Sequence, residues 1–186
     1  MFFAGNDEVH KTMRRLARRL ERVGIAYAIM GGMAVNAHKH RRTTEDVDVL
    51  VTREGFNQFK QLFVPKKYST VPGRPRRFVD KVNAIEVDFL LTGLYPGSGK
   101  RGPIAFPEPG SVGEFINRLC FVDLATLIQL KLAARRHQDF GDVVKLIEAQ
   151  NLDESFAQRL HPSVRLDYLE CLDEKLREDE YNARDD

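Results

Sequence analysis

A short stretch of alternating valines and aspartates, "TTEDVDVLV" (Thr43 to Val51), constrains the fold more than any other part of the chain. Successive side chains of a strand point to opposite faces, so Val47 and Val49 face one way and Asp46 and Asp48 the other. The two carboxylates would lie roughly 6.5–7 Å apart and repel each other, and burying them unpaired would cost several kcal/mol. The segment predicts a strand with one apolar face for a core and one acidic face for a cation.

A second segment, "AIEVDFLL", alternates in the same way and places Glu86 and Asp88 on one face. If the two strands are neighbours, Asp46, Asp48 and Asp88 can converge on one point. Three convergent carboxylates suit a hard divalent cation such as Mg²⁺. Two such ions about 4 Å apart stabilise the attacking and leaving oxygens of a phosphoryl displacement.

On the acids alone, a second interpretation stays open: Asp46 and Asp48 are ordinary strand-edge acids paired with Arg41 and Arg42. The upstream stretch "IMGGMAVNAHKH" favours a functional site, because a buried strand there ends in Gly-Gly and passes into a helix. Such a turn exposes backbone N–H groups to an anion, and glycine lets a phosphate approach without meeting a Cβ. By itself a Gly-Gly turn is also a common tight connection.

Composition indicates an ordinary globular protein, with 42% hydrophobic and 30% charged residues among 186. No run of about 18 apolar residues occurs, so we expect no membrane span. Cys120 and Cys171 have neither zinc-ligand spacing nor a disulfide framework. These features predict a cytoplasmic protein with reduced thiols.

The net charge of +2 conceals an asymmetry along the chain. Residues 1–150 hold 24 Lys and Arg against 16 Asp and Glu, a balance of +8, whereas residues 151–186 hold 5 against 11, a balance of −6. A basic body suits an anionic ligand such as a nucleotide or nucleic acid. A solvated surface of mixed sign explains the same charge equally simply.

Apolar periodicity and turn residues predict an α/β (α+β) chain. We expect helices over residues 7–24, 33–40 and 53–63. Strands are expected over residues 25–30, 46–51 and 85–91. The last of these strands would pair with the strand before it in a hairpin that turns at residues 82–84. A loop dense in Gly and Pro (93–110) is the best boundary, and beyond it the pattern is helical. The predicted architecture is a short mixed β-sheet flanked by helices in residues 1–110, with a helical region, 111–186, packed on it.

The combination of Gly31-Gly32, Asp46-Val47-Asp48 and a later Asp88 resembles the nucleotidyltransferase superfamily, which has the polymerase-β-like fold. Thirteen residues separate Gly32 from Asp46, and the superfamily signature has a gap of about that length. The stretches "RRTTEDVDVLV" and "LATLIQLKLAARRHQDFGDVVKLI" resemble the small bacterial branch of abortive-infection and type IV toxin nucleotidyltransferases. The resemblance covers roughly residues 20 to 150.

The resemblance implies transfer of a nucleoside monophosphate from an NTP to an acceptor hydroxyl, with two Mg²⁺ ions as cofactor and Mn²⁺ as an alternative. Gly31 and Gly32 would hold the triphosphate, and Asp46 and Asp48 would bind the metals. Asp88 would bind the catalytic metal and orient or deprotonate the acceptor. Whether Glu86, on the same strand face, contributes to the metal site is left open.

Basic and polar residues outside the acids complete the expected nucleotide site. Lys131 and Arg135 are four apart in a predicted helix and so share a face, with Asp139 next along it. In the resembling branch a helix of this kind touches phosphates or acceptor, although a solvated helix with an Arg–Asp pair is the plainer interpretation. Arg42 and Thr44, just before the acids, are expected to reach phosphate oxygens.

The acceptor and the partners are the least determined part of the function. As the acceptor we expect first the 3′ end of tRNA or another RNA, second a small molecule such as an antibiotic, and third a protein hydroxyl. The resemblance also implies a toxin–antitoxin role with an antitoxin partner, and a homodimer is a further expectation. The alternative of another class is a non-catalytic nucleotide-binding scaffold or toxin–antitoxin partner.

Overall fold

The computed structural model describes residues 7–183, which form one seven-stranded sheet of order β3-β4-β5-β2-β1-β7-β6. The pairs β2–β5 and β1–β7 are parallel and the other neighbouring pairs are antiparallel, so the sheet is mixed, as expected. The strands are β1 (Tyr27–Ile29), β2 (Asp46–Val51), β3 (Tyr68–Val71), β4 (Arg74–Asp80), β5 (Glu86–Leu91), β6 (Gly113–Ile116) and β7 (Leu119–Val122).

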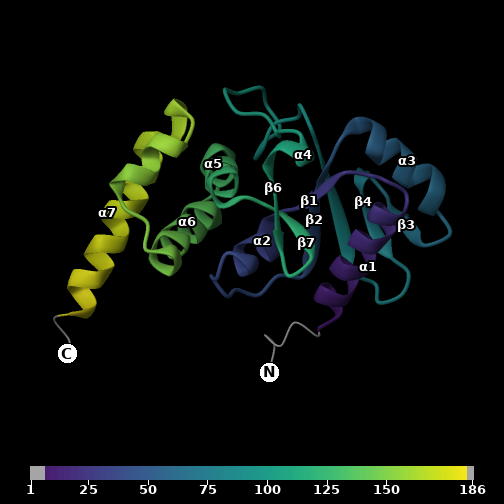
Figure 1. The fold of residues 1–186 in the computed structure, drawn as a ribbon, viewed down its shortest axis with the longest axis horizontal. Helices are drawn as coiled ribbons and strands as arrows, with labels where there is room; N and C mark the ends of the chain where they lie inside the picture. Colours follow the sequence, from purple (N-terminus) through teal and green to yellow (C-terminus); the bar gives the residue numbers. More distant parts are fainter. Residues whose placement is uncertain (1–6, 184–186) are drawn as a thin grey trace.

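Helices pack around this sheet, with α1 and α3 toward one end of the molecule and α5, α6 and α7 toward the other (Figure 1). No helix within residues 7–183 combines the length and the apolar character that crossing a membrane requires. The helices are α1 (Glu8–Arg22), α2 (Gly31–Ala37), α3 (Arg53–Phe63), α4 (Pro109–Val112), α5 (Leu124–Ala134), α6 (His137–Gln150), α7 (Arg165–Asn182) and two 3₁₀ turns, Glu154–Arg159 and Pro162–Val164.

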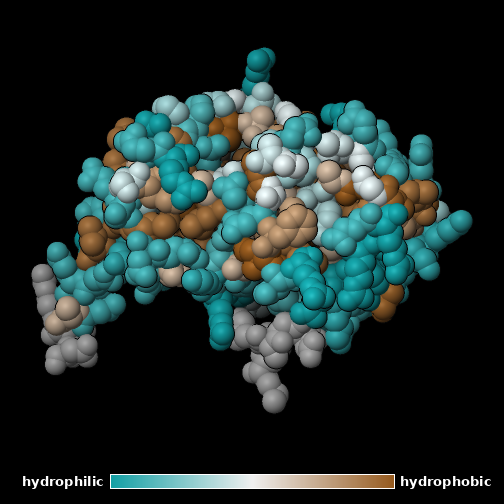
Figure 2. All heavy atoms as spheres, in the orientation of Figure 1, coloured by the Kyte–Doolittle hydropathy of each residue, from teal (hydrophilic) through white to brown (hydrophobic). Residues whose placement is uncertain are grey.

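Helix α1 begins at a side-chain cap, because Asp7 accepts a hydrogen bond of 2.8 Å from the backbone N–H of His10. Its apolar stripe is buried, and its opposite side contributes to a hydrophilic surface (Figure 2). Two of its arginines turn inward: Arg15 and Arg19 both pair with the buried carboxylate of Asp80 on β4. The basic face of α1 is therefore partly used to fix the helix on the sheet.

An aromatic cluster anchors α3 to the apolar face of the sheet. Phe59 of α3 is fully buried, 4.4 Å from Phe89 of β5 and 5.5 Å from Phe78 of β4 between ring centroids. The valines of β2, Val47 and Val49, are also fully buried. The apolar half of the alternating pattern thus forms core, which leaves the acidic half on the other face.

The predicted fold class is confirmed, and the structure adds strands that the sequence patterns did not indicate. The predicted hairpin exists as β4 and β5, but β3 and the β6–β7 hairpin were missed. Both are short, and β6 is largely exposed, so neither shows a long apolar alternation. The chain after residue 110 accordingly begins with strands of the same sheet rather than with helices alone, and the division at residue 110 stays a prediction.

Truncation of the central aromatic side chain tests this packing. Phe59→Ala should lower the free energy of unfolding by about 3–5 kcal/mol, because it opens a cavity among four other rings. Phe115→Ala, at a site 74% exposed on β6, should change it by less than about 0.5 kcal/mol. Urea unfolding followed by circular dichroism measures both, and equal decreases would contradict the assigned core.

Candidate active site

The predicted acids lie side by side because β2 and β5 are neighbouring parallel strands. Asp48 stands opposite Asp88 and Asp46 opposite Glu86 in the register, so all four carboxylates share one face of the sheet. They line a cavity of about 1000 Å³ together with Gly31 and residues of the 93–110 loop, α5 and α6. The structure therefore places Asp46, Asp48 and Asp88 on one face of two adjacent strands, and their role as a metal site stays a prediction.

The Gly-Gly turn at the start of α2 packs directly against Asp48. Gly31 has φ +58°, and a Cβ at this position would lie 1.8 Å from Oδ2 of Asp48. A Cβ on Gly32 would lie 2.7 Å from Oγ1 of Thr44. Both positions therefore exclude a side chain, the first by conformation as well as by contact.

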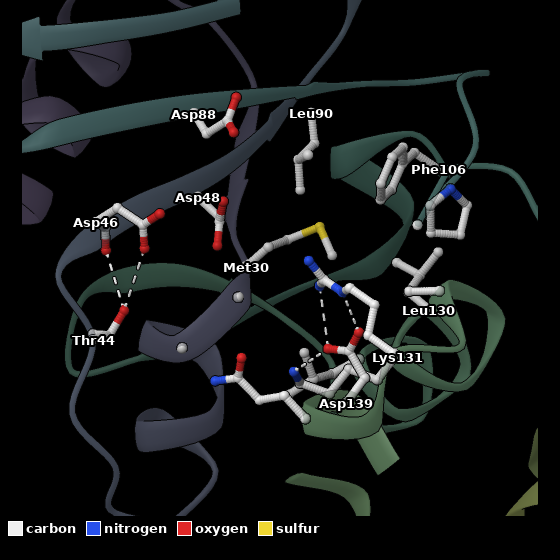
Figure 3. A pocket seen from close by; sticks show the side chains of 18 of the residues that line it. Met30, Thr44, Asp46, Asp48, Asp88, Leu90, Phe106, Leu130, Lys131 and Asp139 are labelled. Carbon is white, nitrogen blue, oxygen red and sulfur yellow. Dashed lines mark hydrogen bonds and ion pairs between the residues drawn. The ribbon is translucent and has the colours of Figure 1, made fainter. Parts of the chain in front are cut away.

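The two residues predicted just before the acids also lie in the cavity. Thr44 donates a long hydrogen bond from Oγ1 to the backbone oxygen of Asp46 at 3.4 Å and another to its Oδ1 at 3.5 Å (Figure 3). Arg42 lines the cavity, and its Nη2 lies 3.1 Å from where a Cβ of Gly32 would stand. Arg42 and Thr44 thus border the Gly-Gly turn, and their contact with phosphate oxygens stays a prediction.

The carboxylate of Asp48 forms no ion pair within the described residues, and Lys131 and Arg77 offset its charge only from a distance. Among residues 7–183 neither Asp46 nor Asp48 forms an ion pair, so the alternative of strand-edge acids paired with Arg41 and Arg42 is not what the structure has. Burial, and then the negative charges of Asp46 and Asp88, raise the pKa of Asp48 to about 7. A cation from outside the chain would lower the pKa again.

Arg77 of β4 is a site residue that sequence reasoning missed. It donates to Oε2 of Glu86 at 2.6 Å and to Oδ2 of Asp88 at 2.8 Å, and these hydrogen bonds raise its own pKa. Its position beside Asp88 could have been predicted, because a hairpin centred between residues 82 and 83 places residue 77 opposite residue 88. The observed strand register pairs these two residues. Arg77 thus pairs with both acids of β5 and offsets one of their two charges, whereas Asp46 and Asp48 of β2 form no ion pair within residues 7–183.

The carboxylates are of the kind that binds magnesium, but their side chains do not form a complete coordination site as they stand. Across residues 7–183, no three His, Cys, Asp or Glu side chains are grouped closely enough to hold a metal ion as they stand. Within the described chain Asp46 and Asp48 nevertheless offer carboxylate oxygens outside any ion pair, the ligands Mg²⁺ prefers, on the wall of a cavity of about 1000 Å³. Asp88 is held by Arg77.

Lys131 and Arg135 do not share a face, contrary to the prediction. Helix α5 ends at Ala134, and Arg135 adopts the left-handed conformation with φ 56°. Its side chain is 67% exposed and pairs with Asp167 of α7 at 3.2 Å. The structure therefore does not bring Arg135 to the cavity, whereas the next residue, Arg136, does line it.

Lys131 lies at the cavity wall, but its ammonium is already bound. Nζ donates to Oδ1 of Asp139 at 3.1 Å and to Oδ2 of Asp142 at 2.6 Å, and all three side chains are under 10% exposed. Arg136 binds the same Asp139 through Nε at 2.6 Å, and Nε of Arg42 lies 3.2 Å from Oδ1 of Asp142. Lys131 is the centre of an alternating chain of charges that holds Arg42 and Arg136 at the cavity.

The 93–110 loop supplies the wall that faces these charges. Tyr95, Ser98 and Phe106 are among its lining residues. Gly97 packs against the end of α5, since a Cβ there would lie 2.4 Å from the backbone oxygen of Ala134. The loop is thus positioned by the helix that carries Lys131.

Comparison with known proteins agrees with this geometry. The model of the aminoglycoside-2″-adenylyltransferase family matches residues 12–97, which include both glycines and the three predicted acids. An antigenic nucleotidyltransferase-like protein from Paracoccidioides brasiliensis has a similar structure, with a TM-score of 0.50 and 16% identity over 88% of this chain and 93% of that one. That likeness shows the nucleotidyltransferase fold.

A second solved structure, ANT(2″)-Ia in complex with adenylyl-2″-tobramycin, is similar at a TM-score of 0.46 and 11% identity, over 80% of this chain and 97% of that one. A comparison with curated proteins gives no match.

The ion chain yields a prediction that separates Lys131 from Arg135. Lys131→Met should lower the free energy of unfolding by about 3 kcal/mol, because it removes the cation shared by two buried carboxylates. Arg135→Gln should change it by less than about 1 kcal/mol, since it removes only an exposed pair. Chemical unfolding of both variants checks this, and a stable Lys131→Met protein would refute the structural role.

Because the pKa of Asp48 is raised, replacing its carboxylate with a neutral amide should increase the free energy of unfolding by an amount that depends on pH. A carboxyl whose folded pKa lies above its unfolded value of 3.8 favours the fold while protonated, and that contribution is lost as pH rises through about 7. In EDTA, Asp48→Asn should therefore be more stable than the wild type near pH 8, and the gap should close toward pH 4. Urea unfolding across this range measures the gap. Glu114→Gln, at an exposed acid of β6, is the control and should show none.

Proposed function

We propose that this chain, which has the nucleotidyltransferase fold, is a nucleotidyltransferase that transfers a nucleoside monophosphate from an NTP to an acceptor hydroxyl, releasing pyrophosphate. The observation that carries the proposal is the contact of Asp48 with the Cβ-free backbone of Gly31, beside Asp88 on the next strand. A phosphate-binding turn and uncompensated carboxylates in one cavity suit a nucleotide with its counter-cations.

The triphosphate would lie along the Gly-Gly turn. Backbone N–H groups of Gly31 and Gly32 would face its oxygens, with Thr44 and Arg42 as donors on the side where they border Gly32. Arg136 takes the role that we first expected of Arg135, because it lines the cavity. The triad of Lys131, Asp139 and Asp142 would position the two arginines rather than bind phosphate.

Asp46, Asp48 and Asp88 would hold Mg²⁺, or Mn²⁺ in its place, which when bound supplies positive charge to the phosphates and the entering oxygen. Asp46 and Asp48 are free of ion pairs for this purpose, and Asp88 would leave its contact with Arg77. Glu86, held by the same guanidinium, shares their strand face. The bound cation would also return Asp48 to its ionised state, since opposite charge lowers a carboxyl pKa.

The acceptor oxygen would attack the α-phosphorus as the bond to the bridging oxygen of the β-phosphate breaks. Pyrophosphate carries away that bridging oxygen with its electron pair, and the hydroxyl proton passes to the Asp88 carboxylate. The chain would contribute chiefly by holding acceptor and phosphate in line and by fixed charges, because phosphoryl transfer needs little covalent help.

Two acceptor classes have support from different observations. The basic body of the chain and the resemblance to toxin-like nucleotidyltransferases favour an RNA or tRNA 3′ end, which would fit a toxin with an antitoxin partner. The match to the aminoglycoside-2″-adenylyltransferase family model favours an antibiotic hydroxyl. A non-catalytic scaffold and a homodimer stay predictions as well.

Label transfer tests the reaction and the acceptor together. Purified protein with Mg²⁺ and each α-labelled NTP in turn should label tRNA or total RNA, or else an aminoglycoside such as tobramycin. We expect Asp48→Asn to reduce the rate at least about 100-fold, because it removes a charge on which the transition state depends. Thin-layer and gel separation of the products give the acceptor.

Glu114→Gln is the matched control, since it removes an exposed carboxylate outside the cavity and should keep full activity. If no acceptor is labelled, the protein's melting temperature should be measured with Mg²⁺ and NTP. A rise without transfer would favour the scaffold, since a ligand that binds the folded state stabilises it. Labelling by Asp48→Asn at the wild-type rate would refute the proposed site.

A further inference from the structure

Asp88 has different neighbours on its two sides, because β5 is the strand between β4 and β2. On the β4 side lies Arg77, which is paired with Asp88 in the register and donates to its Oδ2 at 2.8 Å. On the β2 side, Asp48 stands opposite Asp88 in the register (Figure 3). The carboxylate of Asp88 therefore lies between a cationic side chain and a second carboxylate.

Arg77 has an anchor at the cavity besides Asp88. Its other terminal nitrogen, Nη1, donates to Oε2 of Glu86 at 2.6 Å, and its side chain is only 21% exposed. Glu86 and Asp88 lie one pleat apart on the same face of β5, so the planar guanidinium spans both carboxylates with one nitrogen each. If Asp88 turns toward Asp48, Glu86 still holds the arginine.

The charge of Arg77 bears on when a metal ion can use Asp88. A guanidinium stays protonated in proteins, so Arg77 cannot release Asp88 by losing its charge. A divalent cation that binds Asp88 without other ligands must compete with this partner and lie close to a like charge. A cation that enters with a triphosphate brings phosphate oxygens and negative charge, and Mg²⁺ usually binds through one or two carboxylates plus substrate phosphates.

We propose that Arg77 is a positioning residue that keeps Asp88 from a free divalent cation and releases it to a cation that enters with a nucleotide. Glu86 is the anchor of Arg77 and not a metal ligand. Asp46 and Asp48 bind a cation first, and Asp88 joins them once the triphosphate is in place. The inference rests on the proposed function, because it gives an order to the assembly of that same site.

Binding of Mn²⁺ without nucleotide tests this order and needs no transfer reaction. Electron paramagnetic resonance measures free Mn²⁺ as the protein is titrated. Arg77→Gln should bind Mn²⁺ at least roughly 10-fold more tightly than the wild type, because it removes a competing positive charge beside Asp88. Asp88→Asn should abolish this gain in the Arg77→Gln background, and in the wild-type background it should change the affinity less than about 2-fold.

The nucleotide should remove most of the difference between the two proteins. Calorimetry would measure the affinity for the Mn²⁺ complex of each α,β-methylene NTP, which cannot be transferred. Wild type and Arg77→Gln should differ less than about 3-fold here, since the triphosphate offsets the charge of the arginine. A difference as large as that for Mn²⁺ alone would overturn the proposed release.

Glu86 gives a separate test, which distinguishes an anchor from a ligand. Glu86→Gln should weaken binding of the Mn²⁺–nucleotide complex roughly 10-fold, because Arg77 is then held by Asp88 alone. This loss should disappear in the Arg77→Gln background, since residues that act through one another are not additive. A loss of the same size in both backgrounds would make Glu86 a metal ligand and refute its role as anchor.

The matched control is Arg74→Gln, which removes an exposed cation of the same strand that does not line the cavity. Equal Mn²⁺ affinities of the wild type and Arg77→Gln, or an equal gain in Arg74→Gln, would overturn the proposal. Should Arg77→Gln not fold, Arg77→Lys keeps the charge but cannot span two carboxylates as a planar fork. It should bind Mn²⁺ more tightly than the wild type, and an unchanged affinity would contradict the inference.

These results separate the order of binding from the reaction. Label transfer by the wild type, with a Mn²⁺ affinity that Arg77→Gln leaves unchanged, would refute this inference and leave the proposed function standing. A gain in Mn²⁺ affinity that depends on Asp88, with no transfer to any acceptor, would support the role of Arg77 and contradict the proposed reaction.

Discussion

The contact between the Asp48 carboxylate and the backbone of Gly31 is the constraint on which the arrangement of the cavity depends. A carboxylate occupies the space that any side chain at position 31 would need. The strand β2, the start of α2 and the loop before β2 are therefore fixed relative to one another at a point where charge is concentrated. Among residues 7–183 this charge has no ion pair, which is costly for folding and favours a ligand that brings a cation.

On the opposite wall of the cavity, ion pairs hold cationic side chains in place. Two buried aspartates of α6 share the ammonium of Lys131 and each binds one arginine at the cavity. Pairing inside the protein restricts the arginines, so under the proposed function less conformational entropy would be lost when they bind phosphate. One wall of the cavity carries carboxylates and the other carries arginines held by ion pairs. The proposed triphosphate would orient along this separation of charge.

The acidic half of the site was predictable because its signals are local. Alternation with period two placed Asp46, Asp48 and Asp88 on strand faces, and glycines marked the turn. The symmetry of the hairpin would have given Arg77 as well. The basic half depends on tertiary contacts: the end of α5 at Ala134 has no glycine to mark it, so Arg135 was placed on a face that the helix does not reach. The bond between Lys131 and Asp142 joins two separate helices, and no local pattern indicates which of their side chains meet.

The hairpin of β4 and β5 also bears on the order in which this sheet assembles. Its two strands are joined by a short turn and can pair early, whereas β2 and β5 pair in parallel across α3 and the hairpin itself. If the hairpin forms first, Arg77 offsets one of the two charges on Asp88 and Glu86 before either carboxylate meets the acids of β2. A contact close in sequence would then reduce the repulsion between the two acidic strands as they pair.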